Sequence, residues 1–375
     1  MKDLSFINAL PLAKQQAILN GPALTPPPGV KPNFTNPPNL NNVGYGVIVS
    51  SAIICGTLVI LRLYSRWVYH KKIDIEDGAA VAALGALAGF FYCSWMTIVH
   101  PGLFVHQWNV QLKDMFMAAY YMNVGATIYG NVIMALKTGI LLEWSKTFVP
   151  RGFKNSFWWT CHTVLAINVV FYVICTFVEI FGCEPREKLW KLTLPGKCLD
   201  MPKINIVSAA VNFVSDVIIL LLPQKIIWGL HMSVSKKLGV AAIFAVGLFA
   251  TICAGIRIHS ASMFAKSDDV MYNAADMGLW CIAEMTGGFL ILCLPSLRKM
   301  VTDSPWIQKI VSTVKSNRTS STGAASSRVP TVGEISRPKP RTADDILYSG
   351  WDRNDSVPFH SISISTKRSE SSERT

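Results

Sequence analysis

Seven long apolar stretches occupy the middle of this chain and constrain its fold more than any other feature. Each has at least about 20 mostly apolar residues, which as a helix crosses the roughly 30 Å hydrocarbon core of a bilayer. Only 15% of the 375 residues are charged, against about 25% in soluble domains. We therefore predict an all-α bundle of seven transmembrane helices within residues 43–300. The predicted spans are residues 43–65, 77–99, 118–142, 158–182, 204–223, 238–258 and 276–297.

Small residues recur inside these stretches, as in 78–89 and 239–247. They let membrane helices approach closely, which matters where lipid provides no hydrophobic driving force for helix association. The alternative, a soluble protein with buried core helices, would need more amphipathic helix to cover its core. Residues 1–42 are rich in Pro and Asn and lack the apolar region of a signal peptide. We expect the first span itself to direct insertion.

The basic residues predict that the N-terminus lies outside and the C-terminus in the cytoplasm. In that orientation fifteen Lys and Arg residues lie on the inner side and nine on the outer side, as the positive-inside rule requires. Cys183 and Cys198 then share an outer loop, 15 residues apart, where an oxidising environment favours a disulfide. Free thiols or a metal site are the alternative, although no histidine nearby in sequence completes a zinc set.

The terminal segments carry further signals. Asn33-Phe34-Thr35 is a glycosylation sequon, which can be used only on the lumenal side. The sequons at Asn317 and Asn354 would face the cytoplasm, and we expect neither to be used. Residues 301–316 begin with a Ser-Pro helix start and repeat apolar residues at helical spacing, which predicts an amphipathic helix on the membrane surface. The Ser/Thr-rich residues 317–375, like the N-terminal 1–42 tail, are predicted to be disordered.

A few polar side chains interrupt the spans away from their ends. Lys137 lies in the third span, Asn212 and Asp216 lie one helical turn apart in the fifth, and Glu284 lies near the centre of the seventh. Because a charge at the bilayer centre costs roughly 2.5–3.5 kcal/mol, we expect these groups to face the bundle interior. Three roles are open: fixing the packing, an ion or proton path, or a switchable latch in which Lys137 pairs with Asp216 or Glu284.

Other polar groups give weaker signals. Glu179 and Arg257 lie near outer span ends, where we expect their side chains to snorkel toward the interface. His100 and His106 flank the first outer loop, where paired histidines can bind a metal or sense pH. Loop histidines are usually solvated, so we predict no metal site. The chain has no hydrolase, metalloprotease, P-loop or dinucleotide motif, no inverted repeat and no nucleic-acid motif, so we expect neither an enzyme nor a nucleic-acid partner.

Several short residue patterns occur in and just after the fifth span, in the sixth and seventh spans, and in the outer loops. They comprise Asn212, Asp216, Pro223, Leu230 and Lys237; Gly239, Gly247 and Arg257; Trp280, Glu284, Pro295, Leu297 and Arg298; and Cys183, Cys198, Gly102 and His106 in the outer loops. With these patterns the chain resembles the fungal rhodopsin-like integral membrane family over roughly residues 43–300. Phe104 stands where the family pattern has a second glycine.

The resemblance implies a receptor-like membrane protein, since the family includes receptor-like proteins. It also implies an association with fungal secondary-metabolite biosynthesis, since other members are encoded beside mycotoxin clusters, satratoxin among them. The seventh span has no lysine before Lys299, so we expect no retinal Schiff base and no cofactor. Its Trp280 and Glu284, with Lys137, Asn212 and Asp216, are the candidate ligand or latch residues.

Two functions remain in competition. The first is a receptor-like sensor of an unknown small molecule, with a cytoplasmic signalling partner. The second is a transporter or export accessory for a small apolar metabolite. A membrane-embedded biosynthetic enzyme and a scaffold are weaker alternatives. We expect the plasma membrane rather than an internal membrane in either case.

Overall fold

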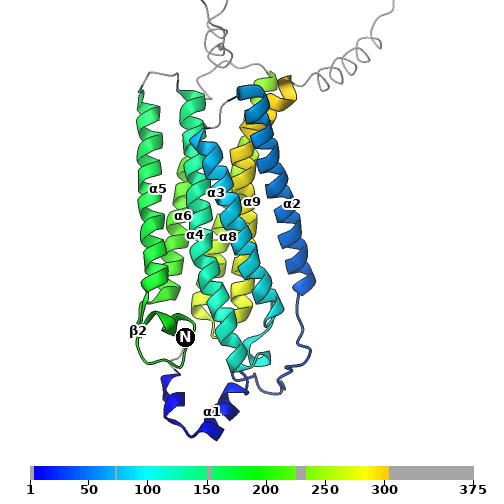
Figure 1. Ribbon diagram of the computed structural model, residues 1–375, viewed down its shortest axis with the longest axis vertical. Coiled ribbons are helices and arrows are strands. Elements are labelled where there is room, and N and C mark those ends of the chain that lie inside the picture. Colours follow the sequence, from blue (N-terminus) through cyan, green and yellow to red (C-terminus); the bar gives the residue numbers. More distant parts are fainter. Residues whose placement is uncertain (1–3, 72–73, 150–153, 225–233, 304–375) are drawn as a thin grey trace, which may run out of the picture. The chain divides into compact units, whose positions relative to one another are not determined.

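Seven helices long and apolar enough to cross a membrane run side by side in the described part of the chain, as predicted (Figure 1). The computed structural model describes residues 4–71, 74–149, 154–224 and 234–303, all within one compact unit. The spanning helices are α2 (Asn41–Ser65), α3 (Ile75–Val99), α4 (Leu112–Phe148), α5 (Ser156–Phe181), α6 (Met201–Leu221), α8 (Val234–Lys266) and α9 (Val270–Asp303). The protein is therefore a multi-pass membrane protein with an all-α seven-helix bundle.

Polar residues at the start of three helices explain where those helices begin. Asp74 and Asp77 form a capping box at the N-terminus of α3, each side chain accepting from the other residue's backbone N–H. Asn155 accepts from the backbone of Trp158 to start α5, and Asp200 accepts from that of Lys203 to start α6. Such caps satisfy backbone donors that a helix leaves without partners in its first turn.

Three helices, α4, α8 and α9, extend well beyond their predicted spans. Helix α4 has 37 residues, about 55 Å at the usual rise, and so projects past the hydrocarbon. Helix α9 passes through Pro295 and continues to Asp303, beyond residue 297, where the predicted span ends. Neighbouring helices can compensate the hydrogen bond that a proline removes inside a membrane. Residues 301–303 thus extend α9, and the remainder of the predicted surface helix lies outside the described residues, as does the 317–375 tail.

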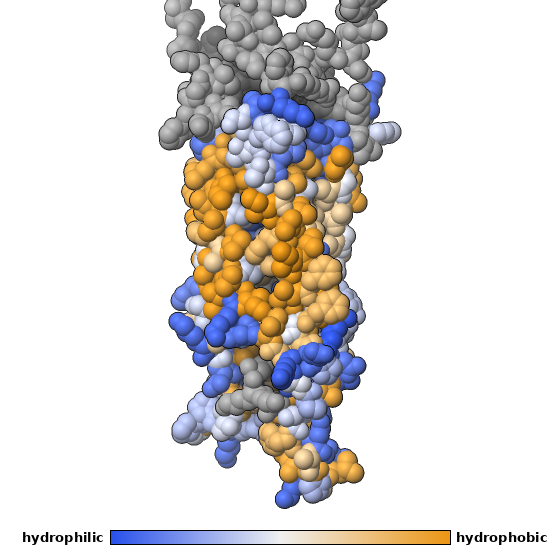
Figure 2. Space-filling model, turned by 90° about the vertical axis from the view of Figure 1, so that its left-hand side faces the viewer, coloured by the Kyte–Doolittle hydropathy of each residue, from blue (hydrophilic) through white to orange (hydrophobic). Residues whose placement is uncertain are grey.

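The bundle core lies where α2, α3, α4 and α9 meet. Leu87, Leu136, Met285, Phe289 and Leu292 are all fully buried there. Figure 2 shows the opposite situation on the outer surface, where a broad apolar belt covers the middle of the bundle between hydrophilic ends. Apolar side chains of α5 such as Ile167, Val170 and Phe177 are more than half exposed. Such a belt is what contact with lipid requires.

One end of the bundle, here called the hairpin end, carries the irregular elements. Strands β1 (Cys183–Glu184) and β2 (Lys197–Cys198) pair antiparallel, and the predicted disulfide joins Cys183 to Cys198. Short helices η4 (Arg186–Leu189) and η3 (Gln107–Asn109) lie in the connecting loops. The other end, where α9 terminates, is called the tail end.

The N-terminal segment is ordered in its described part, contrary to our expectation of a disordered tail. It forms η1 (Ser5–Ala9) and α1 (Leu12–Leu19). The backbone N–H of Leu4 donates to the carbonyl of Leu192 at 3.3 Å, and the Asn8 amide donates to that of Thr193 at 2.8 Å. A bridge between Pro22 and Gln111 fixes the segment to the start of α4. The predicted sequon residue Asn33 is exposed in this segment.

Candidate functional site

A cluster of buried polar side chains lies halfway along the bundle and joins five helices. We call it the midplane cluster. Its members are Tyr129 and Lys137 of α4, Tyr172 of α5, Asn212, Ser215 and Asp216 of α6, Arg257 of α8 and Glu284 of α9.

Lys137 is the cation on one side of the midplane cluster. Its Nζ lies 2.9 Å from Oδ1 of Asp216 and donates to Oδ1 of Asn212 at 2.8 Å and to the hydroxyl of Ser215. Lys137 is only 4% exposed, so these partners replace water around its ammonium group. The structure thus brings Lys137 and Asp216 together, whereas a direct Lys137–Glu284 pair does not form among the described contacts.

Glu284 links Asn212, a partner of Lys137, to a second cation, Arg257. Its Oε1 accepts from the Asn212 amide at 2.6 Å, and its Oε2 accepts from the Tyr129 hydroxyl at 3.0 Å. The same Oε2 lies 3.1 Å from Nε of Arg257. Arg257 is 6% exposed and lies over the ring of Tyr129, 4.9 Å from its centroid. Our expectation that Arg257 snorkels was therefore wrong, because a carboxylate and an aromatic face within the bundle stabilise the guanidinium.

A cavity of about 580 Å³ extends from the hairpin end down to this cluster. All seven spanning helices and the disulfide hairpin contribute to its lining. Its walls are mainly apolar, including Leu103, Met115, Met122, Leu192, Met271 and Leu279. Volumes of roughly 300–1,000 Å³ with apolar walls and few polar groups are typical of small-molecule sites.

The floor of the cavity is polar and is shared with the midplane cluster. Tyr129, Glu179 and Arg257 line it, and Glu179 lies beside Thr127 and Arg257. Glu179 therefore faces the cavity rather than the interface that we expected. Nη2 of Arg257 is buried and has no hydrogen-bond partner among the described residues. Since a buried charged donor without a partner is costly, this atom marks the floor as a place for an acceptor.

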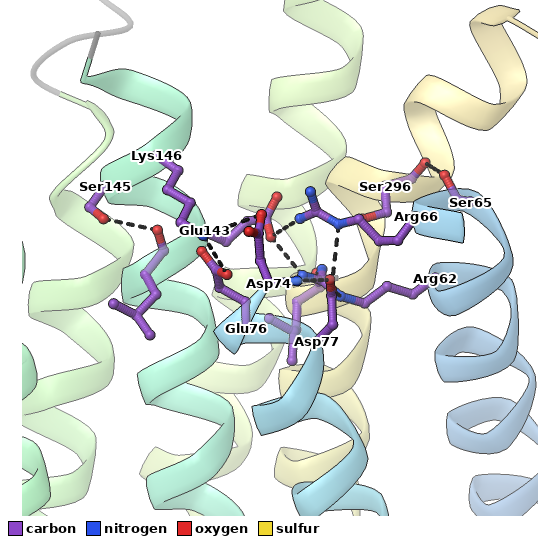
Figure 3. A network of polar contacts seen from close by, with 12 residues as sticks. Arg62, Ser65, Arg66, Asp74, Glu76, Asp77, Glu143, Ser145, Lys146 and Ser296 are labelled. Atoms are coloured by element: carbon purple, nitrogen blue, oxygen red, sulfur yellow. Dashed lines mark hydrogen bonds and ion pairs between the residues drawn. The ribbon is translucent and has the colours of Figure 1, made fainter. Parts of the chain in front are cut away.

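A second buried polar cluster lies at the tail end and was missed from the sequence (Figure 3). We call it the tail-end cluster. It is formed by Arg62 and Arg66 from α2 and its π-helical extension η2 (Arg66–His70), by Asp74, Glu76 and Asp77 around the start of α3, and by Glu143 and Lys146 of α4.

Arg62 is the centre of the tail-end cluster and is fully buried. Its Nε lies 2.9 Å from Oδ1 of Asp77, and its Nη2 lies 2.6 Å from Oε2 of Glu143. It also donates to the carbonyl oxygen of Leu292 in α9. The neighbouring Ser65 hydroxyl donates to the carbonyl of Ser296 at 3.1 Å. The cluster thus ties α2, α3, α4 and α9 together at this end.

The tail-end cluster was not recognised from the sequence because its charged residues lie at or near the ends of the predicted spans. Arg62 and Arg66 lie near the end of a span, where we counted them as inner-loop charges, and Glu143 follows the third predicted span directly. The available signal was complementary charge at the tail-end limits of three consecutive spans. Because charges at span ends are ordinarily solvated, that signal does not separate a buried cluster from a wet surface.

The loop between α3 and α4 is held against the start of α9. Nδ1 of His106 lies 2.6 Å from Oδ2 of Asp269, and its ring stacks between Trp108 and Tyr272 at centroid distances of 4.2 and 4.4 Å. Phe104, which replaces the family's second glycine, has φ +56°, a left-handed conformation that glycine adopts most easily. Its ring packs edge-on against Tyr272.

The remaining sequence candidates lie apart from these clusters. Trp280 is partly exposed on α9, and it is not among the residues lining the cavity. His100 is exposed, and the described residues contain no group of three or more His, Cys, Asp or Glu side chains placed to hold a metal ion.

Comparisons with known proteins agree with the pattern of residues in the spans. A family model described as the fungal rhodopsin domain matches residues 61–303. Fugralins biosynthesis cluster protein 2 of Gibberella zeae is 37% identical over 295 residues, covering 78% of this chain and 73% of that protein. A SAT4 family membrane protein of Emericella nidulans is 32% identical over 51% of this chain and 48% of its own length. Satratoxin biosynthesis SC1 cluster protein 4 of Stachybotrys chartarum is 25% identical over 44% of this chain and 59% of its own.

Proposed function

The chain belongs to the fungal rhodopsin domain family, and from that premise we propose that it is a receptor-like sensor of a small molecule. The molecule would bind in the cavity at the hairpin end, and the tail end would interact with a cytoplasmic signalling partner. The observation that carries the proposal is the polar floor of an otherwise apolar cavity of about 580 Å³. We propose that the protein has no enzymatic activity and binds no retinal cofactor. We further propose that it lies in the plasma membrane.

Helix α9 supplies a physical route from the cavity to the tail end. Val270 and Leu279 line the cavity, Glu284 belongs to the midplane cluster, and the carbonyls of Leu292 and Ser296 accept hydrogen bonds in the tail-end region. A ligand that shifts α9 would therefore change contacts at both clusters. Two arrangements with different ligand affinity are what a sensor requires.

The polar clusters favour a sensor over the competing export role. Lys137 and Asp216 close the bundle below the cavity, and Arg62 with Asp77 and Glu143 closes it again at the tail end. A transported molecule would have to pass both clusters, breaking buried ion pairs each time. A sensor needs only a small displacement of the same groups.

The proposed biological setting is secondary-metabolite biosynthesis, because relatives are named for fugralins and satratoxin biosynthesis clusters. The test is a deletion strain of the native host, profiled for metabolites inside and outside the cell. A sensor predicts altered production, whereas an exporter predicts continued production with retention in the cell. Unchanged production with normal secretion would count against both functions.

Complementation with cavity variants makes this test specific. Gly278 lines the cavity, and a Cβ built there meets nothing within 4 Å. The variant Gly278→Phe places a large side chain at the cavity wall, at a position where its Cβ meets no neighbour, and should fail to complement. Gly85 is exposed on α3 with equally open surroundings, so Gly85→Phe should complement fully. Equal complementation by both variants would remove the cavity from the mechanism.

A further inference from the structure

The floor of the cavity specifies what kind of polar group a ligand must present. Arg257 is 6% exposed, lines the cavity, and keeps Nη2 without a hydrogen-bond partner among the described residues. The neighbouring Tyr129 hydroxyl is already engaged as a donor to Glu284. A ligand that reaches the floor can therefore supply an acceptor for a hydrogen bond from the Arg257 guanidinium.

The charges around the floor restrict this acceptor to a neutral group. Lys137 pairs with Asp216, Arg257 pairs with Glu284, and Glu179 lines the cavity together with Arg257. Two cations thus already meet three carboxylates, and another anion would add repulsion in a buried site. A protonated amine has no lone pair with which to accept the hydrogen bond, and it would place a second positive charge against Arg257.

The remainder of the cavity demands apolar surface. Leu103, Met122, Leu192 and Leu279 line its walls, and methionine side chains adapt to differently shaped apolar ligands. We propose that the cavity binds a neutral, largely apolar molecule whose carbonyl oxygen, as in a ketone, ester or lactone, accepts a hydrogen bond from Nη2 of Arg257. This inference rests on the proposed sensor function and names its ligand class.

The experiment uses the full chain in lipid nanodiscs and four photoreactive probes. The probes share one alkyl chain with a diazirine at the far end and differ only in the other end: methyl ketone, carboxylate, primary amine or plain alkane. Mass spectrometry locates the labelled residues, and titration gives the affinity of cavity labelling. We expect the ketone to label cavity residues with an affinity roughly tenfold or more above that of the alkane, because hydrogen bonds to charged groups are strong.

The variant Arg257→Met/Glu284→Gln removes both members of this buried ion pair and leaves no hydrogen-bond donor on the side chain at position 257. It should abolish the ketone preference while retaining cavity labelling. Arg257→Lys, which keeps the charge but lacks Nη2, provides a second variant should the first fail to fold. Gly278→Phe should lose cavity labelling by every probe and keep labelling at the lipid-facing surface.

The outcomes separate this inference from the proposed function. Preferred labelling by the carboxylate or the amine, equal affinity for ketone and alkane, or a ketone preference that survives in both Arg257 variants would overturn the ligand class. Each of those results still includes cavity labelling, so the sensor proposal would stand. Labelling confined to the lipid-facing surface for all four probes would overturn both.

Discussion

Each buried charge of the midplane cluster has a partner of opposite charge. Lys137 faces Asp216 at 2.9 Å, and Arg257 faces Glu284 at 3.1 Å. Removing one member of such a pair leaves an uncompensated charge, whereas removing both leaves neutral groups of similar size. The contribution of a pair is therefore measured by a double-mutant cycle rather than by a single substitution.

The variant Lys137→Met should lower the free energy of unfolding by about 3–5 kcal/mol, because it leaves the Asp216 carboxylate buried without its cation. Lys137→Met/Asp216→Asn should cost less than the sum of the two single variants. Thermal unfolding of the purified protein in nanodiscs measures both effects. Strictly additive single and double variants would show that the two side chains are not coupled.

For the midplane cluster, the sequence predicted the charged residues in the middle of the spans better than the one near a span end. Lys137, Asp216 and Glu284 were predicted to face inward, since a charge inside an apolar run has few other places to go. Arg257 was not, because a long side chain near a span end can extend toward water or toward the bundle. The direction in which the Arg257 side chain points depends on how α8 packs against its neighbours. The spacing of residues in the sequence does not show this packing.

At the scale of helices, close approach between α8 and α9 depends on glycine. A Cβ built on Gly287 would lie 3.0 Å from Cβ and 3.5 Å from Cα of Ala250. Small residues facing each other in this way allow backbones to pack tightly in lipid. The number of helices was predictable from the length and composition of the apolar runs, but these contacts were not, because the sequence does not show which of the span glycines face another helix and which face open space.

The variant Gly287→Val should destabilise the bundle by about 1–3 kcal/mol, since α8 and α9 would have to separate. Gly85→Val places the same side chain where a Cβ meets nothing within 4 Å and should leave the melting temperature nearly unchanged. Comparing thermal unfolding of the two variants tests the interface. Equal melting temperatures would mean that α8 can move away from α9 at Ala250 without loss of stability.

The tail-end cluster joins four helices through one side chain. Arg62→Leu should therefore destabilise the protein by about 3–5 kcal/mol, because Asp77 and Glu143 lose their buried partner. Lys191→Leu removes an ion pair with Glu187 in which both side chains are more than half exposed and should cost no more than about 1 kcal/mol. Urea titration followed by tryptophan fluorescence compares the two. An effect of Arg62→Leu no larger than that of Lys191→Leu would contradict the assignment of Arg62 as the centre of the tail-end cluster.

For the whole molecule, the two ends of the bundle differ in construction. The hairpin end is covered by the disulfide hairpin, the N-terminal segment and the His106 loop, whereas the described tail end is held by charged side chains. The sequence predicted the disulfide from two loop cysteines, but it did not predict the ordered N-terminal segment. That segment is rich in Pro and Asn, and its order depends on distant partners such as Leu192 and Thr193.

The predicted orientation, with the hairpin end outside, can be tested through glycosylation. Asn33 is exposed, so the protein expressed in fungal cells should lose electrophoretic mass on treatment with a peptide N-glycosidase. Asn33→Gln should remove this shift, and Asn317→Gln and Asn354→Gln should retain it. A shift that depends on Asn317 or Asn354 instead would reverse the orientation.

The contacts of the N-terminal segment impose an order of events during synthesis. Asn8 is among the first residues to leave the ribosome, yet its partner Thr193 follows 185 residues later, after four spans have been made. The hairpin end can therefore close only when more than half of the chain has been translated. Until then the N-terminal segment lacks its partners in the bundle. Closure of the hairpin end over the cavity is therefore a late step in biogenesis.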